Sequence, residues 1–564
     1  MRLSTLVGAA VALYLGSLLS GGYILLLHGL LVTLSSEPYA ALALMAGLVA
    51  ASSVSVLGVA RKAFADLYPR CWLGGLAAGF ITASALLLTI SSLANYALLL
   101  VYLVLGFILS PALPAVKGLR GGARRLAAYW TVLGVLALAL LLVKLYQPVA
   151  SSTLVAEVGL CEPIDVNGLY RFTPLMTAYV YAVDRIQLPT HTIYPQDSYI
   201  YYMGGHSVYN WIIEPEGIWN QLTREPAGVV LVYGDSYPPN VTIVERRLAW
   251  LHNIRFNGLY FDSLLLRIIA ASGFALRPIL EDNMEVLKNG RVYILVPLVG
   301  WERGLLASIP VLRGYAVVDE DGSIRVIDPS VVAREFPWVP LLPEVVAREW
   351  VEVLRYKPGF IEVYLYHNTF VVRDVGTNPQ PYLTLDDEGR QWWVFVAEPP
   401  GETYSAKYVL YVAAGDLEPR VLVYRLPRPV IGVSKVASYV KQAHPAFDWD
   451  QFRVEEPIPA VINGRLYWKV TVVTRDYRGL VAVDLVDAET GQVYSLQPKR
   501  HASYLDVMSL LIEEKPVGPE ESLYKRIEEL EEKLKAIREE LDRVLEELEA
   551  IKSLIAAGNE TVAR

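Results

Sequence analysis

The sequence predicts a membrane α-helical bundle of five transmembrane helices, followed by a β-rich α+β ectodomain and a C-terminal parallel coiled coil. Three observations predict this fold class. Long apolar runs fill the first 147 residues, short alternating strands with turn residues follow, and apolar residues near the C-terminus recur in heptads. The composition agrees, because 54% of the 564 residues are hydrophobic and the mean hydropathy is +0.34.

Each apolar run is long enough to cross a hydrocarbon core, which needs about 20 helical residues. Lys and Arg occur after the second and fourth runs but not in the alternate loops, so we expect a cytoplasmic N-terminus and an extracellular body and C-terminus at the cell membrane. The first run could be a signal peptide, but it is longer than an apolar signal core and lacks a convincing cleavage site. The predicted transmembrane domain is 1–147, with runs at Leu3–Leu34, Tyr39–Ala60, Cys71–Leu93, Tyr96–Val116 and Leu126–Val143.

The predicted ectodomain comprises modules at 148–330, 331–430 and 431–515. Three segments share a tight glycine turn, then an arginine, then an aromatic residue two positions later. A glycine at φ > 0 followed by an alternating strand is typical of a hairpin. The segments are either three unrelated hairpins or copies of a duplicated unit, and both interpretations stay open: Asn289–Tyr293, Glu388–Trp392 and Asn463–Tyr467. We expect helices at 245–250 and 262–271 to pack on these sheets.

Two stretches resemble known families. The third hairpin continues through Trp468-Lys469-Val470 to 483–491, and residues 435–497 resemble the PepSY domain, a small helix-plus-sheet module of secreted and membrane proteins. Residues 246–256, 290–293, 408–416 and 422–432 resemble blocks of an uncharacterised family of large microbial integral membrane proteins. That resemblance implies an N-terminal helical bundle and a big extracytoplasmic body. This chain has five predicted helices where the family has seven, and the family has no established activity, so no functional residues carry over.

The C-terminal segment 519–557 carries an uninterrupted 4-3-4-3 apolar spacing, which keeps one stripe facing a partner only in a left-handed supercoil. Its central layers place Leu at a and β-branched residues at d, which favours a parallel trimer or tetramer over a dimer. Alternatively, the helix folds back on its own ectodomain. The predicted oligomerisation residues are Leu523, Ile527, Leu530, Leu534, Ile537, Leu541, Val544, Leu548, Ile551 and Ile555.

Motifs that carry chemistry are scarce in this sequence. It has no HExxH, CxxC, phosphate-binding loop, GxSxG or EF-hand loop, so we expect no catalytic residue, cofactor or metal. His191 and His206 are fifteen residues apart, near Asp197, Ser207 and Asp235, which matches no compact ligand motif and favours a surface loop. Nearby aromatic residues could stack on sugars or peptides, although core packing is favoured: Tyr199, Tyr201, Tyr202, Tyr209, Trp211 and Trp219. Asn240 and Asn559 begin possible glycosylation sequons.

These observations predict a membrane-anchored, homo-oligomeric cell-surface scaffold or binding protein without catalysis. Its expected partners are further copies of itself, the lipid bilayer and other cell-envelope proteins. Nucleic acid is not expected, because the net charge is −8 and no basic patch occurs. A channel or transporter subunit is the main alternative, although the runs lack the charged residues that ion-coupled transport usually requires. An extracytoplasmic hydrolase is the third. The low Cys and Met content is typical of a thermophile.

Overall fold

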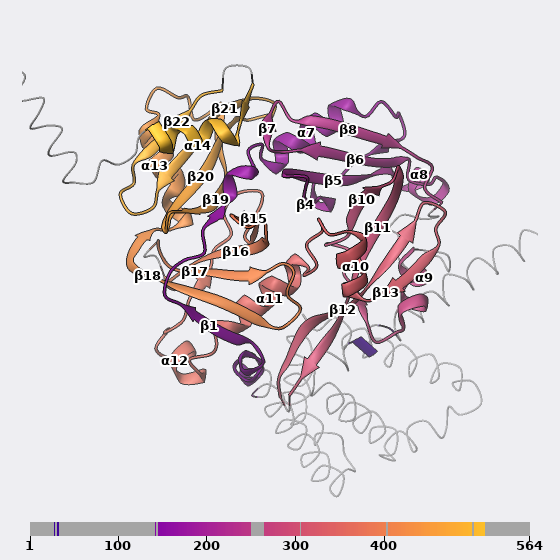
Figure 1. Cartoon of the computed structure of the whole chain (residues 1–564), viewed down its shortest axis with the longest axis horizontal. Helices are drawn as coiled ribbons and strands as arrows, with labels where there is room; N and C mark the ends of the chain where they lie inside the picture. Colours follow the sequence, from indigo (N-terminus) through magenta and orange to yellow (C-terminus); the bar gives the residue numbers. More distant parts are fainter. Residues whose placement is uncertain are drawn as a thin grey trace, which may run out of the picture. The chain divides into compact units, whose positions relative to one another are not determined.

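The computed structural model describes residues 145–249, 264–304, 306–401, 404–498 and 501–513, together with residues 28, 31, 32 and 142. Contacts divide the chain into two compact units, Met1–Tyr504 and Leu505–Arg564. In the second unit, the described residues are 505–513, which belong to one helix. The described part of the first unit is dominated by β-sheet (Figure 1).

Four antiparallel meanders, each of four strands, form the framework of the first unit. Neighbouring strands within each meander are hydrogen-bonded in sequence order. The first comprises β4 (Tyr199–Met203), β5 (His206–Pro215), β6 (Gly228–Tyr233) and β8 (Asn240–Glu245); the second, β10 (Met284–Lys288), β11 (Arg291–Arg303), β12 (Ser308–Asp319) and β13 (Ile324–Ile327); the third, β15 (Tyr382–Asp386), β16 (Gln391–Glu398), β17 (Ser405–Ala413) and β18 (Arg420–Ile431); and the fourth, β19 (Phe452–Ile462), β20 (Arg465–Thr474), β21 (Leu480–Asp487) and β22 (Val493–Leu496).

Short strands extend and connect the meanders. β2 (Val166–Asn167) pairs with both β15 and β19, so it joins the third and fourth meanders into one continuous sheet. β1 (Ala156–Leu160) pairs in parallel with β18, and β3 (His191–Thr192) pairs with the end of β5. The remaining short strands are β7 (Ser236–Tyr237), β9 (Arg277–Pro278), β14 (Val371–Val372) and β23 (Ala502–Ser503).

Helices cover the sheets and contribute to their cores. α11 contacts β12, α9 contacts β13, and α13 contacts β19 and β21. The helix expected at 245–250 is wrong, because Glu245 ends strand β8, whereas the second expected helix lies at α9. The helices are α7 (Leu175–Arg185), α8 (Ile218–Thr223), α9 (Leu264–Ser272), α10 (Pro329–Glu335), α11 (Glu344–Leu354), α12 (Phe360–Tyr364), α13 (Val433–Ala443) and α14 (Tyr504–Glu513), with 3₁₀ turns η4 (Ser152–Leu154), η5 (Gly168–Tyr170) and η6 (Pro195–Asp197).

The three similar sequence segments occupy the same place in three meanders, the turn between the first and second strands. Their glycines have φ values of 74° to 77°: Gly290, Gly389 and Gly464. The arginine after each glycine pairs with an aspartate at 2.6–2.7 Å: Arg291 with Asp319, Arg390 with Asp386, and Arg465 with Asp487. In the first meander, His206 follows Gly205 and pairs with Asp235 at 2.9 Å. The pairing is not the same in all three, because Asp319 and Asp487 end the third strand of their meanders whereas Asp386 ends the first. Duplication and three unrelated hairpins therefore both stay open.

The predicted fold class, a five-helix membrane bundle joined to other parts, is wrong. In the described part of the chain the structure is sheet-dominated, and no helix is both long and apolar enough to cross a membrane. The five predicted runs lie outside the described residues, except residues 28, 31, 32 and 142. A high apolar content was an ambiguous signal, because strands buried on both faces also produce apolar runs. In β20, for example, every residue from Leu466 to Val473 is buried.

The predicted coiled coil receives no support from the structure. The described residues contain no coiled coil, and they end at Glu513, before the predicted oligomerisation residues Leu523 to Ile555. The heptad pattern is a feature of the sequence that no described residue tests, so self-association through this segment stays a prediction. The module boundaries at 330, 430 and 515 also stay predictions.

Candidate functional site

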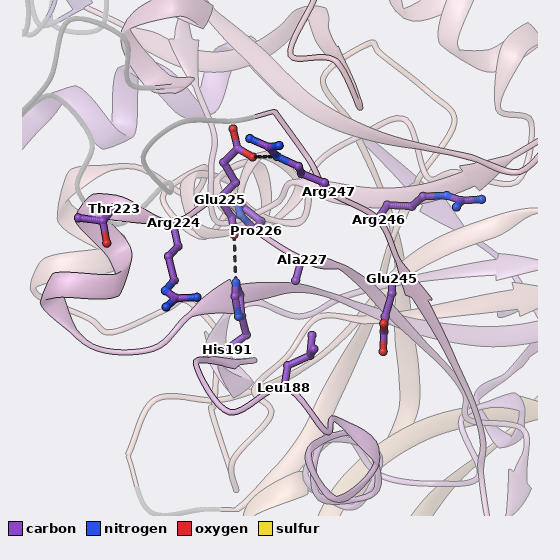
Figure 2. A pocket seen from close by; sticks show the side chains of 10 residues that line it. All are labelled: Leu188, His191, Thr223, Arg224, Glu225, Pro226, Ala227, Glu245, Arg246 and Arg247. Atoms are coloured by element: carbon purple, nitrogen blue, oxygen red, sulfur yellow. Dashed lines mark hydrogen bonds and ion pairs between the residues drawn. The ribbon is translucent and has the colours of Figure 1, made fainter.

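A pocket of about 590 Å³ opens on the first meander (Figure 2). Its volume lies within the range of about 300–1,000 Å³ that small-molecule sites usually have. The lining residues come from the start of β3 and the loop before it, from the end of α8 and the segment leading to β6, and from the end of β8 and the two residues after it. They are Leu188, His191, Thr223, Arg224, Glu225, Pro226, Ala227, Glu245, Arg246 and Arg247.

The pocket wall is held by backbone pairing that requires a glycine. Arg246 N donates to Ala227 O at 2.9 Å, and Leu248 N donates to Pro226 O at 3.2 Å, so the chain after β8 continues alongside the start of β6. Gly228 begins β6 with φ +138°, and a Cβ there would lie 2.0 Å from Val244 O. Only glycine permits this backbone conformation and this close approach of the two strands.

His191 has a fixed place in the wall of the pocket and is not a free base. Its Nε2 lies 3.0 Å from Glu225 O, and its Nδ1 lies 3.0 Å from Thr190 Oγ1. Because a carbonyl oxygen only accepts, Nε2 carries a proton that it donates to Glu225 O. Both nitrogens of His191 are therefore engaged by the protein itself.

Arginines give the pocket its positive character. Three arginines and two glutamates line it, and Arg247 Nε donates to the Glu225 carboxylate. Arg224 is exposed and its Nε donates to Asn220 Oδ1 at 3.1 Å, which orients its guanidinium beside His191 (Figure 2). Arg246 is exposed and extends outward from the opposite side (Figure 2). Planar guanidinium groups match carboxylate and phosphate oxygens.

The structure does not bring the two sequence-predicted histidines together. His206 begins β5, whereas His191 pairs with Pro215 at the other end of that strand. At 3.3 Å per residue, the two ends of β5 are about 30 Å apart. His206 serves the turn pairing with Asp235, and buried Ser207 donates its hydroxyl to Tyr170 O. These residues therefore form no joint metal or hydrolytic site.

The aromatic residues of the same region divide into two groups. Five of them are at most 5% exposed and belong to the core: Tyr199, Tyr201, Tyr202, Tyr209 and Trp211. Trp219 on α8 is different, because 76% of its surface is exposed. Packing accounts for the first group and leaves Trp219 without a structural explanation.

A second hollow, of about 320 Å³, lies between α11, β1 and β17, and its basic groups are already paired. Lys357 Nζ lies 3.0 Å from a Glu157 carboxylate oxygen, and Arg355 lies 3.0 Å from Glu352. A ligand there would have to compete with these ion pairs. The pocket of the first meander is therefore the better candidate.

A buried charged cluster, which the sequence reasoning missed, joins distant parts of the first unit. Arg171, Glu456 and Lys469 are each at most 3% exposed. Arg171 lies 3.6 Å from Glu456, and Lys469 Nζ donates to the carbonyls of Arg171 and Phe172. Burial lowers the pKa of Lys469 to about 7. The cluster is enclosed by protein groups, which indicates a structural role.

Two acidic residues, Asp282 and Glu344, lie at the N-terminus of α11. Asp282, 7% exposed, accepts a hydrogen bond from Val345 N at 2.9 Å, while the N-cap residue Pro343 provides no side-chain bond. Burial raises the pKa of Asp282, and burial together with the Asp282 charge raises the pKa of Glu344. Two carboxyl groups with raised pKa values could suggest acid catalysis, but Asp282 is engaged as a helix cap.

The raised pKa of Asp282 predicts a pH-dependent stability. A carboxyl whose pKa is higher in the folded state contributes stability at low pH, which is lost as the pH rises from about 4 through the folded pKa. In the wild type, ionisation of Asp282 should lower the unfolding free energy between pH 5 and pH 8, by at most about 1.4 kcal/mol per pH unit. Asp282→Asn cannot ionise, so we expect this contribution to disappear in the variant. Denaturant titrations over this range measure it. The control is Asp448→Asn, an exposed carboxylate bonded to Asp450 N, and equal slopes in both variants would contradict the prediction.

His444, Asp484 and Ser495 form a cluster that differs from a nucleophile triad. His444 Nε2 lies 2.9 and 3.1 Å from the two Asp484 carboxylate oxygens and 3.5 Å from Ser495 Oγ. In a triad the carboxylate and the hydroxyl contact different ring nitrogens. Because both groups meet the same nitrogen here, His444 cannot remove the Ser495 proton while held by Asp484. The cluster ties α13 to the fourth meander.

Two further sequence-based interpretations can be placed. Within the described ranges, no group of three or more His, Cys, Asp or Glu side chains could hold a metal ion. Asn240 is exposed at the start of β8, and Asn559 lies outside the described residues. Glycosylation of Asn240 stays a prediction.

Comparisons with known proteins identify no family. No family model and no curated protein matches the chain. Among solved structures, the GH43_1 enzyme from Xanthomonas citri complexed with xylotriose is 12% identical with a TM-score of 0.19, covering 58% of this chain and 92% of that one. A mutant of Trypanosoma rangeli sialidase displaying trans-sialidase activity is 9% identical with a TM-score of 0.14, covering 56% and 55%. Such low TM-scores carry no information about activity. The resemblances to PepSY and to the uncharacterised membrane family stay predictions.

Proposed function

We propose that the body of this chain is a binding module without catalytic chemistry, and that the pocket of the first meander takes a ligand with a carboxylate or phosphate group. The observation that supports this proposal is the pocket itself, which has a volume of about 590 Å³ and three arginines in its lining. Arg224 and Arg246 are exposed, so they can reach a ligand. Charge-assisted bonds from arginine to such oxyanions are among the stronger hydrogen bonds in proteins.

Binding has better support than hydrolysis at this site. A general base needs a free lone pair within hydrogen-bond reach of the proton it removes. Nδ1 of His191 is engaged by the Thr190 hydroxyl at 3.0 Å, and the Glu225 carboxylate is occupied by Arg247. The two clusters with catalytic residue types elsewhere, at Asp282 and at His444, cap a helix and join a helix to a sheet.

Removing one guanidinium tests the proposed site. We expect Arg224→Ala to weaken binding of glucuronate and of inorganic phosphate, measured separately by calorimetry, by about ten-fold or more, because a charged hydrogen bond contributes roughly 1.5–3 kcal/mol. Arg224→Lys should restore only part of the affinity, since an ammonium cannot bind two oxygens in a fork.

The control variant is Arg420→Ala, an exposed arginine that pairs with Glu418 at 2.7 Å on another meander. Its affinities should equal those of the wild type. If glucuronate alone binds, the site recognises a carboxylate, and if phosphate alone binds, it recognises a phosphate. Absence of binding for both, or equal losses in Arg224→Ala and Arg420→Ala, would refute the proposal.

A further inference from the structure

Trp219 lies on α8, one helical turn before the pocket-lining residue Thr223. In a helix, residues four positions apart lie on the same face, and Thr223, four residues after Trp219, lines the pocket together with Arg224. The Thr223 hydroxyl donates to the backbone oxygen of Trp219 at 2.7 Å, as expected one turn apart in a helix. The Trp219 side chain therefore starts one helical turn from the rim of the pocket.

Among the described tryptophans, Trp219 stands out because 76% of its surface is exposed, whereas Trp211, Trp350, Trp393 and Trp468 are fully buried and Trp301, Trp338 and Trp449 are partly buried. A large apolar ring left in water next to a pocket marks a place where a ligand can cover it. The ring offers a flat apolar face, whereas the neighbouring arginines offer oxyanion recognition. A ligand that uses both must have an apolar face and carry negative charge.

We propose that the pocket and Trp219 together bind an acidic sugar chain, with a uronate carboxylate at Arg224 and an adjoining pyranose ring stacked on the Trp219 indole. The axial hydrogens of a pyranose form an apolar face, and the ring hydroxyls lie at its edge. Glu245, which also lines the pocket and is exposed, can accept hydrogen bonds from hydroxyl groups. This inference rests on the proposed function and adds the class of ligand to it.

Two ligands of equal charge separate the stacking contact from the charge contact. Trigalacturonate and citrate each carry three carboxylates, but only the first has pyranose rings. We expect the wild-type full chain to bind trigalacturonate at least about ten-fold more tightly than citrate. Methyl-esterified trigalacturonate, which lacks the charges, should bind weakly because the arginines then have no anionic partner.

The variant Trp219→Ala should lower the affinity for trigalacturonate by about ten-fold and leave the citrate affinity unchanged, while Trp219→Phe should retain part of the preference. Tyr366→Ala is the matched control, because Tyr366 is a similarly exposed aromatic residue, at 71%, in another part of the unit. It should change neither affinity. Arg224→Ala should lower the affinity for both trigalacturonate and citrate.

The outcomes distinguish the two proposals. If Trp219→Ala leaves the ratio of the two affinities unchanged, the sugar inference is overturned, and the anion-binding proposal stands as long as Arg224→Ala still weakens citrate. If trigalacturonate binds no better than citrate in the wild type, stacking is likewise excluded. If neither ligand binds, both proposals fail.

Discussion

Replacing Glu456 by Ala is expected to reduce the unfolding free energy by about 3–5 kcal/mol, because it leaves a buried guanidinium without its counter-charge. Glu456 is 1% exposed and its Oε1 accepts from Leu175 N at 2.8 Å and from Asn378 Nδ2 at 2.9 Å. Arg171 lies on its other side. One carboxylate therefore holds the start of α7, the loop before β15 and the segment after β2.

A graded series separates the charge from the hydrogen bonds. Glu456→Gln keeps an oxygen for Leu175 N but removes the charge, so its loss should be smaller than that of Glu456→Ala. The control is Asp184→Ala, which breaks an ion pair with Arg478 at 3.0 Å whose side chains are 52% and 61% exposed. Such an exposed pair contributes about 0–1 kcal/mol. Denaturant unfolding of the full chain gives all three values, and a loss in Glu456→Ala no larger than in Asp184→Ala would contradict the expected role.

This cluster shows why the sequence could not provide the most consequential contacts. Arg171 and Glu456 are 285 positions apart, and neither belongs to a recognisable motif. A bulge in the pairing of β19 with β20, between Glu455 and Ile458, accompanies a left-handed backbone at Glu456, with φ +47°. An extra residue in one strand re-aims the side chains around it. Strand patterns in the sequence do not reveal where such a bulge occurs.

Local turn chemistry was more informative than overall composition. The glycine turns at 290, 389 and 464 were placed correctly, because a tight hairpin needs φ > 0 and few residues other than glycine adopt it easily. Apolar content was misleading for the fold class, because it measures burial and not the element that is buried. The helix expected at 245–250 illustrates the limit: residues 246–248 instead continue strand β8 and pair with Pro226 and Ala227.

The candidate site was only partly visible in the sequence. His191 and Trp219 both attracted attention there, but only the fold shows that the first is fully engaged and the second exposed. The adjacent Arg246 and Arg247 were a signal that could have been used. Their place opposite Arg224 depends on the pairing of β6 with β8, which brings residues about twenty positions apart to one pocket.

That pairing leads to the second large effect, which is expected for Gly228→Ala. The new Cβ would lie 2.0 Å from Val244 O and 3.0 Å from Arg246 N, and the backbone at φ +138° is strained for alanine. The strands cannot simply separate, because Arg246 N bonds to Ala227 O and Ala227 N bonds to Ile213 O. Overpacking and backbone strain cost roughly 1–3 kcal/mol each, so we expect a loss of about 2–5 kcal/mol.

Gly159→Ala is the matched control, since a Cβ there meets nothing within 4 Å, and its stability should change by no more than about 0.5 kcal/mol. The two variants, compared by denaturant unfolding, differ only in where the same methyl group is added. Gly228→Ala should also weaken glucuronate binding below the unfolding transition, because the shifted β8 end carries Arg246 and Arg247 away from Arg224. Wild-type stability in Gly228→Ala would mean that β6 and β8 are further apart than the structure places them. Reduced stability with undiminished binding would place the ligand elsewhere than in this pocket.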